Sequence, residues 1–539
     1  MQCNLMGKAY GLLCHQFVQV KDGGAGVFFH KLKKLMNSLL LYVAAPLAVR
    51  FDWNWQAAYI SIGNKNMRYL KKLCGQKNSQ TKSIQAVADK TIRCFKKVIE
   101  RNPDLNSIQE WAHASRALQS LYFLQGNMLQ LDEIVQLDAD VRGRLIKRHQ
   151  LDSLNMEFIP LNLALGSIGV YEHLESHIKA GILGISQQKK VILLLNPQIR
   201  ANNPHYLKYW HKYITVITDP ALIQILSPFA AQLTIPLASY MVLNKKISKS
   251  FLTLGTVREQ WNSEGRLPLL TISDEDYELG WECLKSFGIG RGDWFVCLHV
   301  RESGWRGDNT AVEDFRNADI DTYQSAIEEI TKAGGWVVRM GNTGMKPLPK
   351  APRVIDYANC SLKSDAMDIF LCAQCRFFIG TSSGLYTLAM AFGVPVVMTN
   401  LLPACAMYYL TSKDLFIPRL CKLKGSQGYL DFKELLSPPI GTAITQSIYD
   451  ARNIGVIANE ADDIKAVVSE MLERSSGNIT YGQEDERLQK VLRDMTLDCG
   501  HQYGEENIII NARMGRHFLR KHAGLLSFKE KHELNGVSR

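Results

Sequence analysis

Two stretches decide the fold, Trp294-Phe-Val-Cys-Leu-His-Val-Arg301 and, further along the chain, Arg376-Phe-Phe-Ile-Gly-Thr-Ser-Ser-Gly384. Each is a short apolar run that ends in polar residues. Such a run is typical of a parallel strand that is buried on both faces and carries functional groups at its carboxyl end. Because the carboxyl ends of parallel strands meet at one edge of a sheet, we expect the two stretches to form one rim of a binding site.

The turn after the second stretch is predicted to open a helix over 385–392. The turn consists of small residues, Thr381, Ser382, Ser383 and Gly384. They leave the first N–H groups of the helix uncovered, and such donors favour an anion. Arg301 would add a guanidinium beside them, which can bind phosphate oxygens with two parallel hydrogen bonds. The pattern therefore predicts a diphosphate site.

The region around these stretches alternates between strand and helix. The predicted strands are 295–300, 336–340, 353–357, 376–380 and 394–398, and the predicted helices are 320–332, 365–373 and 385–392. A weaker alternation precedes it, with strands at 158–163, 191–195 and 214–217. Strands that alternate with helices favour parallel sheets, so we predict an α/β protein with two doubly wound, Rossmann-type domains that face a cleft. The stretch 402–449 contains four prolines and is predicted to be loop-rich.

The N-terminal part is predicted to be helical, with a tetratricopeptide-like pattern over 80–150. The expected domains are 1–155 (helical), 156–270 (acceptor), 271–475 (nucleotide-sugar) and 476–539 (a helical, basic tail). Residues 31–55 combine lysines, an apolar run and two tryptophans. The run 35–49 is shorter than the roughly 20 residues that span a bilayer, and it fits a membrane-surface segment and a buried core helix about equally. With no cleavable signal peptide evident, we expect a cytoplasmic protein that can lie on the inner membrane surface.

Charge and cysteine usage narrow the classes of partner. The net charge of +11 favours a phosphorylated or membrane-surface partner, but the positive runs are terminal and lack interleaved aromatic strands, which argues against nucleic acid. Of the 12 cysteines only Cys372 and Cys375 form a C-x-x-C pair. The first falls on an apolar helix and the second opens a strand, so we expect reduced thiols and no metal site.

Polar residues follow three strands of the second α/β domain. They are His299 and Arg301, then Arg339, Gly341 and Asn342, then the turn Thr381–Gly384. The long connection 302–319 contributes Arg316 and Asn317 as further donor-binding candidates, and Glu302 and Asp308 as candidates for the general base. In the first α/β domain, Gly166 and Gly169 form a candidate acceptor loop.

The residues of 294–403 resemble a family of bacterial glycosyltransferases of GT-B type and, more distantly, fucosyltransferase-like enzymes. The resemblance is carried by His299-Val-Arg301, Arg316–Ile320, Gly335–Gly341, Ile355–Tyr357, Ser364–Leu371, Cys375–Gly384, Gly393–Pro395 and Thr399-Asn400. It implies a C-terminal domain that holds a nucleotide-activated sugar and an N-terminal domain that admits the acceptor. It also implies that Arg301, the arginine of the His-x-Arg string, neutralises the donor diphosphate.

This chain departs from the fucosyltransferase-like pattern directly after Arg301. Those relatives continue with further Arg, Thr and Asp residues, whereas Glu302-Ser303-Gly304 follows here, so the donor sugar stays open. A positioned arginine can replace the divalent metal of other sugar transferases. The expected reaction is therefore metal-independent transfer from a nucleotide sugar, the co-substrate, to a glycan or lipid-linked acceptor, with no further cofactor. The alternative is a non-catalytic scaffold that retains the fold and binds a partner through its helical region.

Overall fold

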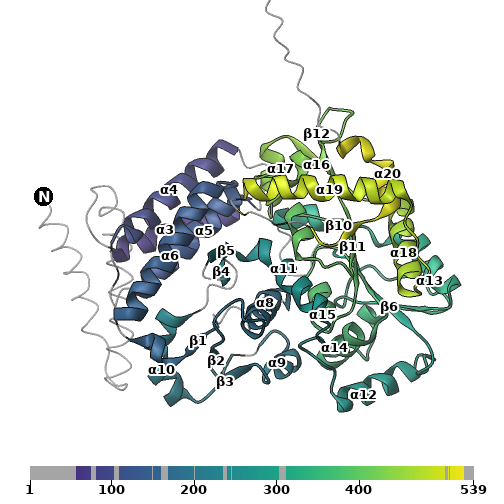
Figure 1. Ribbon diagram of the computed structural model, residues 1–539, viewed down its shortest axis with the longest axis horizontal. Coiled ribbons are helices and arrows are strands. Elements are labelled where there is room, and N and C mark those ends of the chain that lie inside the picture. Colours follow the sequence, from purple (N-terminus) through teal and green to yellow (C-terminus); the bar gives the residue numbers. More distant parts are fainter. Residues whose placement is uncertain are drawn as a thin grey trace, which may run out of the picture.

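A computed structural model describes residues 56–74, 81–101, 103, 108–148, 150–159, 168–199, 201–234, 240–243, 246–302, 311–503, 505, 508 and 510–526. Helices α3 (Gln56–Cys74), α4 (Thr81–Ile99), α5 (Ile108–Gln125) and α6 (Met128–Arg148) form the N-terminal helical region. They pack side by side at one end of the molecule (Figure 1). Their apolar faces meet around Phe95, Trp111 and Leu118, which are almost fully buried. The membrane-surface segment proposed for 31–55 lies outside the described residues.

The first α/β unit is built on a three-stranded parallel sheet. Its strands β1 (Met156–Phe158), β2 (Lys190–Leu194) and β3 (Ile214–Ile217) lie in the order β1-β2-β3. On the other side of β1, Phe158 forms a parallel bridge with Thr234. Helices η3 (Ile168–Val170), α8 (Tyr171–Ile182), α9 (Pro204–Trp210) and α10 (Pro220–Leu233) connect the strands. A hairpin, β4 (Tyr240–Leu243) and β5 (Lys246–Lys249), follows.

The second α/β unit contains a seven-stranded sheet in the order β14-β11-β10-β9-β6-β7-β8, and every neighbouring pair is parallel. Its strands are β6 (Phe295–His299), β7 (Trp336–Arg339), β8 (Val354–Ile355), β9 (Phe378–Gly380), β10 (Val396–Leu401), β11 (Leu415–Pro418) and β14 (Arg513–Met514). The chain moves outward from β6 in one direction and then returns to β9 on its other side. In doubly wound sheets the crevice at this switch point is the usual place for ligands.

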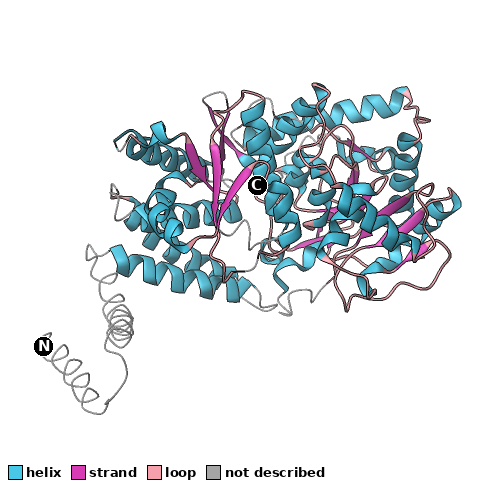
Figure 2. Cartoon of the chain, turned by 90° about the horizontal axis from the view of Figure 1, so that it is seen from below, coloured by secondary structure: helices cyan, strands magenta, loops and turns pink. Residues whose placement is uncertain are grey.

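Helices cover both faces of this sheet, and Figure 2 shows the strands of the two units as separate groups among helices. They are α12 (Asp274–Lys285), η4 (Ala311–Arg316), η5 (Ile320–Tyr323), α13 (Gln324–Lys332), η6 (Tyr357–Asn359), α14 (Asp365–Gln374), α15 (Leu385–Ala391), η7 (Ala404–Tyr409), α16 (Phe432–Leu436), α17 (Gln446–Ala451), α18 (Ala461–Ser475), α19 (Gln483–Gln502), α20 (Arg516–Lys521) and η8 (Ala523–Leu526). A small antiparallel pair, β12 (Leu420–Leu423) and β13 (Ile454–Ile457), completes the unit.

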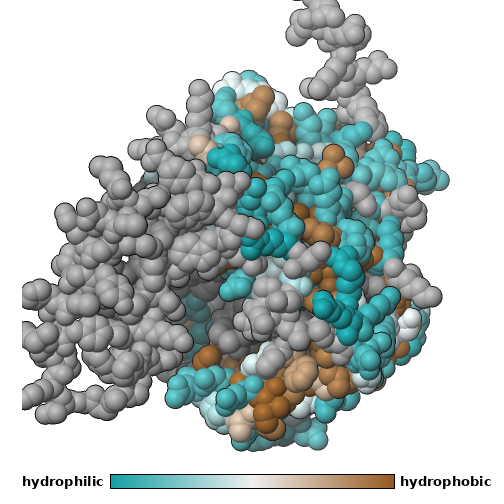
Figure 3. Space-filling model, turned by 90° about the vertical axis from the view of Figure 1, so that its left-hand side faces the viewer, coloured by the Kyte–Doolittle hydropathy of each residue, from teal (hydrophilic) through white to brown (hydrophobic). Residues whose placement is uncertain are grey.

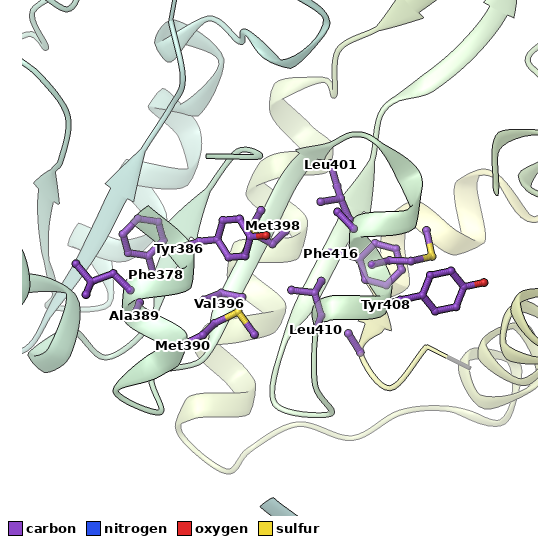
Figure 4. Packing of buried hydrophobic residues seen from close by; sticks show 14 of the residues in the cluster. Phe378, Tyr386, Ala389, Met390, Val396, Met398, Leu401, Tyr408, Leu410 and Phe416 are labelled. Atoms are coloured by element: carbon purple, nitrogen blue, oxygen red, sulfur yellow. The ribbon is translucent and has the colours of Figure 1, made fainter. Parts of the chain in front are cut away.

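Buried apolar side chains from β9, β10, β11 and α15 fill the space beside the sheet. Figure 4 shows Phe378, Val396, Met398 and Phe416 packed together with Leu410, which precedes β11. Strands that are apolar on both faces need such cover on both sides, which explains why β10 is buried along its whole length. The predicted α/β class, a GT-B-like pair of doubly wound units with a helical N-terminal region, is confirmed.

Helix α11 (Ser250–Ser263) connects the two α/β units and contacts both of them, through α8 and η7. A Cβ atom on Gly255 would collide with the backbone oxygen of Tyr408, so glycine allows this close approach. Arg258 of α11 donates to Glu175 of α8 at 2.7 Å and to the backbone oxygen of Tyr409 at 3.2 Å. These buried contacts fix the two units relative to each other.

Two predictions about the C-terminal half were wrong in detail. The stretch 402–449 is not mainly loop, because it contains η7, β11, β12, α16 and α17. The tail after 476 is not helical throughout, because β14 joins the large sheet beside β11.

Among the described residues, none of the helices is both long and apolar enough to cross a bilayer.

Candidate active site

The two stretches that predicted the fold lie side by side at the switch point of the large sheet. His299, the last residue of β6, pairs in register with Gly380 of β9. Beyond the strands, the backbone N–H of Arg301 donates to Oγ1 of Thr381 at 3.0 Å, and the N–H of Thr381 donates to the His299 oxygen at 3.2 Å. The predicted meeting of the two strand ends is therefore confirmed.

Three arginines gather beyond these strand ends, and two of them, Arg301 and Arg316, share one carboxylate. The Glu313 carboxylate accepts from Arg301 Nη2 at 2.7 Å and lies 2.5 Å from Arg316 Nη2. Asn317 links the third arginine to the group: its side-chain oxygen accepts from Arg301 and its backbone oxygen accepts from Arg419. We call Arg301, Arg316 and Arg419, with Glu313 and Asn317, the arginine cluster.

Positive charge exceeds negative charge in the arginine cluster. The Nε–H groups of Arg316 and Arg419 are buried and have no hydrogen-bond partner among the residues that the structure describes. Burial lowers the pKa of Arg419, which is only 5% exposed and has no ion pair with any described carboxylate. A buried cation normally needs an opposite charge or a full set of hydrogen bonds. An anion of more than one charge, such as a diphosphate, would meet that need.

His299 lies beside the cluster as a neutral group. Its pKa is lowered to about 3 by burial, with further contributions from Arg339, Arg301 and Lys363. Its Nδ1 lies 3.0 Å from Oγ of Ser383. A histidine with this pKa stays uncharged at neutral pH, so it can orient groups by hydrogen bonding but does not take up a proton there.

The turn Thr381–Gly384 is held by its own hydroxyl groups. Thr381 accepts from Arg301, Ser382 accepts from the backbone N–H of Leu402 at 3.2 Å, and Ser383 contacts His299. Gly384 is the residue before α15 and has a φ of −73°, which any L residue can adopt. The turn therefore does not need the dihedral freedom of glycine at this position. Crowding remains the reason why a larger side chain would matter.

We predict that Gly384→Val weakens binding of a nucleoside diphosphate by about tenfold or more, because it would disturb charge-assisted hydrogen bonds to the phosphate. Calorimetric titration measures the affinity, and a thermal melt measures the stability. Gly292→Val is the matched control, since Gly292 is exposed and its added side chain would meet open space. A lower melting temperature with normal affinity would instead assign Gly384 to helix packing.

The other residues that were predicted to bind the sugar donor are not part of the arginine cluster. Arg339 is fully buried and binds Glu302 at 3.0 Å and Asp356 at 3.1 Å, and Glu302 also accepts from the backbone N–H of Lys346 at 2.9 Å. Both carboxylate oxygens of Glu302 are therefore occupied, which does not suit a general base. Gly341 has a φ of +148° and its added Cβ would strike Met345, so its role here is conformational. Asn342 is exposed.

Two sequence candidates, Asp308 and Gly166, lie outside the described residues. Gly169 lies in η3, which packs against α15 and so brings the first α/β unit up to the candidate site. The helix that continues from η3 carries Glu172, a residue that the sequence did not single out. No motif marks it, since it lies within an ordinary helical sequence.

Glu172 is a buried carboxylate with two properties of a general base, an oxygen without a described partner and a pKa near neutral pH. Within the described part of the chain, its Oε2 has no hydrogen-bond partner. Burial raises its pKa to about 7, with Arg258 opposing the shift and Glu175 adding to it. On the facing helix α15, burial raises the pKa of the Tyr386 hydroxyl, Glu172 raises it further, and Arg258 and Arg316 lower it. Tyr386 therefore lies within the electrostatic reach of both Glu172 and the arginine cluster. A carboxyl group with a pKa near 7 can exchange a proton at neutral pH.

Acidic pairs with the spacing Asp-x-Asp occur at 138–140, 274–276 and 319–321. Asp138 is buried and lies 2.6 Å from Nε of Arg142. Asp319 and Asp321 are exposed and pair with Lys346, and Asp276 lies 2.7 Å from Nε2 of His205. Among the residues that the structure describes, no three His, Cys, Asp or Glu side chains are grouped to hold a metal ion. Metal independence stays a prediction.

We predict that the initial rate of transfer is unchanged after dialysis against EDTA, because the guanidinium groups would supply the positive charge that a divalent ion supplies elsewhere. The measurement compares rates before and after chelation. A rate that collapses in EDTA and returns with Mg²⁺ or Mn²⁺ would make the metal-free account untenable.

The sequence matches no protein-family model and no curated protein. Among solved structures it is similar to the glycosyl transferase family 9 protein from Veillonella parvula DSM 2008, with 12% identity over 49% of this chain and 85% of that chain and a TM-score of 0.32. It is also similar to E. coli ADP-heptose lipopolysaccharide heptosyltransferase II, with 11% identity over 55% and 98% of the two chains and a TM-score of 0.31. A third similar structure is the iron-containing dodecameric glycosyltransferase TibC from enterotoxigenic E. coli H10407. It has 14% identity over 60% of this chain and 76% of that chain, with a TM-score of 0.31.

Similarity at this level carries no substrate or mechanism over to the chain. None of these three proteins is a fucosyltransferase, so the more distant resemblance stays a prediction. The chain's own strand order, switch point and arginine cluster define a two-unit α/β protein with a candidate anion site at the carboxyl ends of the strands of its larger sheet.

Proposed function

We propose that the protein is a glycosyltransferase that moves a sugar from a nucleotide-activated donor to a glycan or lipid-linked acceptor. The observation that carries the proposal is the arginine cluster at the switch point, where Arg301 and Arg316 share the Glu313 carboxylate and Arg419 has no ion pair with a described carboxylate. A nucleoside diphosphate would supply the negative charge that the arginine cluster lacks. The proposal extends to bacterial surface polysaccharide assembly through the sequence resemblance, which also favours a lipid-linked acceptor.

The larger α/β unit would bind the donor, with its diphosphate against Arg301, Arg316 and Arg419. When the bond between the sugar and the diphosphate breaks, negative charge develops on the leaving oxygen. Guanidinium groups that are already in place stabilise that charge without reorganisation, which lowers the barrier.

The smaller α/β unit would bind the acceptor and supply the general base. For the base we propose Glu172 rather than Glu302, because one oxygen of Glu172 is without a partner while both oxygens of Glu302 are occupied. The acceptor hydroxyl would attack the anomeric carbon as its proton passes to the Glu172 carboxylate. One C–O bond forms, the bond to the diphosphate breaks, and the nucleoside diphosphate leaves. The result is direct displacement.

Mass spectrometry of the products tests this function. The purified protein is incubated with a panel of nucleotide sugars and extracted lipid-linked acceptors, and we expect an acceptor heavier by one sugar together with free nucleoside diphosphate. Binding of a nucleotide sugar without any product, over the whole panel, would favour a non-catalytic scaffold built on the same fold.

A further inference from the structure

Helix α10 of the smaller unit exposes three large apolar side chains on one face. Leu222, Ile225 and Phe229 are 48%, 62% and 37% exposed, and their spacing of three and four residues places them on one side of the helix. The 14-residue helix contains no charged residue. Figure 3 shows hydrophobic residues gathered at the lower end of this face of the molecule, where α10 lies in Figure 1.

The opposite face of α10 is firmly packed, so the exposed face is a fixed feature of the surface. Leu226, Ala230 and Leu233 pack against Ile146 and Leu151 and against β-strand residues. Asp219 caps the helix by accepting from the N–H of Leu222 at 2.8 Å. Because one face of α10 is packed, the side chains on the other face keep a fixed orientation toward the solvent.

A group of positive charges borders this apolar face. Arg144, Lys147 and Arg148, on the last turns of α6, are exposed, and this end of α6 packs against α10 through Ile146. No ion pair involves these three residues within the described part of the chain. The carboxylate of Asp219 lies at the other end of α10, where the helix begins.

We propose that α10 docks this protein on a membrane surface that contains anionic lipid. The three apolar side chains would enter the boundary between headgroups and acyl chains, as the apolar face of an interfacial helix does, while Arg144, Lys147 and Arg148 contact lipid phosphates. An apolar face with a basic rim fits this partner better than a second copy of the chain, whose rim would bring like charges together. The proposal does not depend on the proposed enzyme activity.

Vesicle flotation of the full-length protein tests the proposal. We expect binding to vesicles of phosphatidylglycerol and phosphatidylcholine, and much weaker binding to phosphatidylcholine alone. The combined variant Leu222→Ser, Ile225→Ser, Phe229→Ser should lower the affinity for anionic vesicles by about tenfold or more, and Lys147→Gln with Arg148→Gln by about fivefold for each charge. The matched control is Leu279→Ser, because Leu279 is 61% exposed on α12 in the other unit.

Residues 1–55 are present in every variant, so any membrane binding of their own cancels in the comparison. Thermal melts confirm that the variants fold, which exposed positions should allow. Unchanged vesicle binding of the apolar triple variant would overturn the proposal. So would a wild-type dimer in sedimentation that the triple variant abolishes, because that result would assign the face to a second copy of the chain.

Discussion

Arg301→Ala is expected to slow sugar transfer by about 10²–10³-fold, the cost of removing one positioned donor from a charged transition state. The loss should fall on kcat, since the charge on the diphosphate develops as the bond to the sugar breaks. The fold should survive, because Glu313 keeps its ion pair with Arg316 at 2.5 Å. The measurement is steady-state kinetics together with a thermal melt.

Two further variants make this result specific. Arg301→Lys should restore little activity, because a single ammonium group cannot reproduce the two-pronged contact of a guanidinium. Arg291→Ala is the control, since Arg291 is exposed in the same unit and pairs only with Glu278 among the described carboxylates. A folded Arg301→Ala protein with near-normal turnover would remove Arg301 from the mechanism.

Glu172→Gln is expected to abolish most transfer and, in alkaline solution, to stabilise the protein. Burial raises the pKa of Glu172 from 4.5 to about 7, so the folded state favours the protonated form. The stabilisation that protonated Glu172 provides is therefore fully present below pH 4.5. It is lost as the pH rises from 4.5 through 7, by about 3 kcal/mol in total. Glutamine resembles the protonated acid and avoids that loss. Its melting temperature should exceed the wild-type value at pH 8 and match it at pH 4.

Glu175→Gln provides a control of opposite sign on the same helix. Burial alone would raise the pKa of Glu175, but Arg258 and Lys179 overcome this effect and lower it. Its charged form therefore stabilises the fold above its ordinary pKa, and the glutamine variant should melt at a lower temperature than wild type at pH 8. If Glu172→Gln also melted lower at pH 8, or turned over normally, the acid–base assignment would be wrong.

The large sheet was predictable because its signal is local. Both faces of β6 and β9 are buried, so each strand is a continuous apolar run, and the polar residues begin where the strand ends. Their meeting at one edge follows from parallel pairing alone. Strand β11 escaped prediction because it has only four residues and ends in a proline, and because one of its two parallel partners, β14, comes from a distant part of the chain.

The candidate site was predictable only where it depends on strand ends. Arg339 and Glu302 also follow strands, yet they pair with each other, and the sequence does not distinguish an ion pair that holds a loop from one that binds a ligand. Arg419 and Glu172 were missed because each has a buried polar atom, Nε of Arg419 and Oε2 of Glu172, with no hydrogen-bond partner among the described residues. That property depends on tertiary packing from several elements, such as the contact of Asn317 with Arg419 across 102 residues of chain.

Calorimetric titration with ADP, GDP and UDP tests most directly whether the arginine cluster binds the diphosphate of a sugar donor. The account predicts one saturable site for at least one of them, with affinity reduced about tenfold or more by Arg419→Met and unchanged by Arg291→Met. Methionine fills the buried volume of Arg419 without its charge, so the fold should be retained. Equal affinity in wild-type and Arg419→Met proteins, or no binding of any of the three nucleotides, would contradict it.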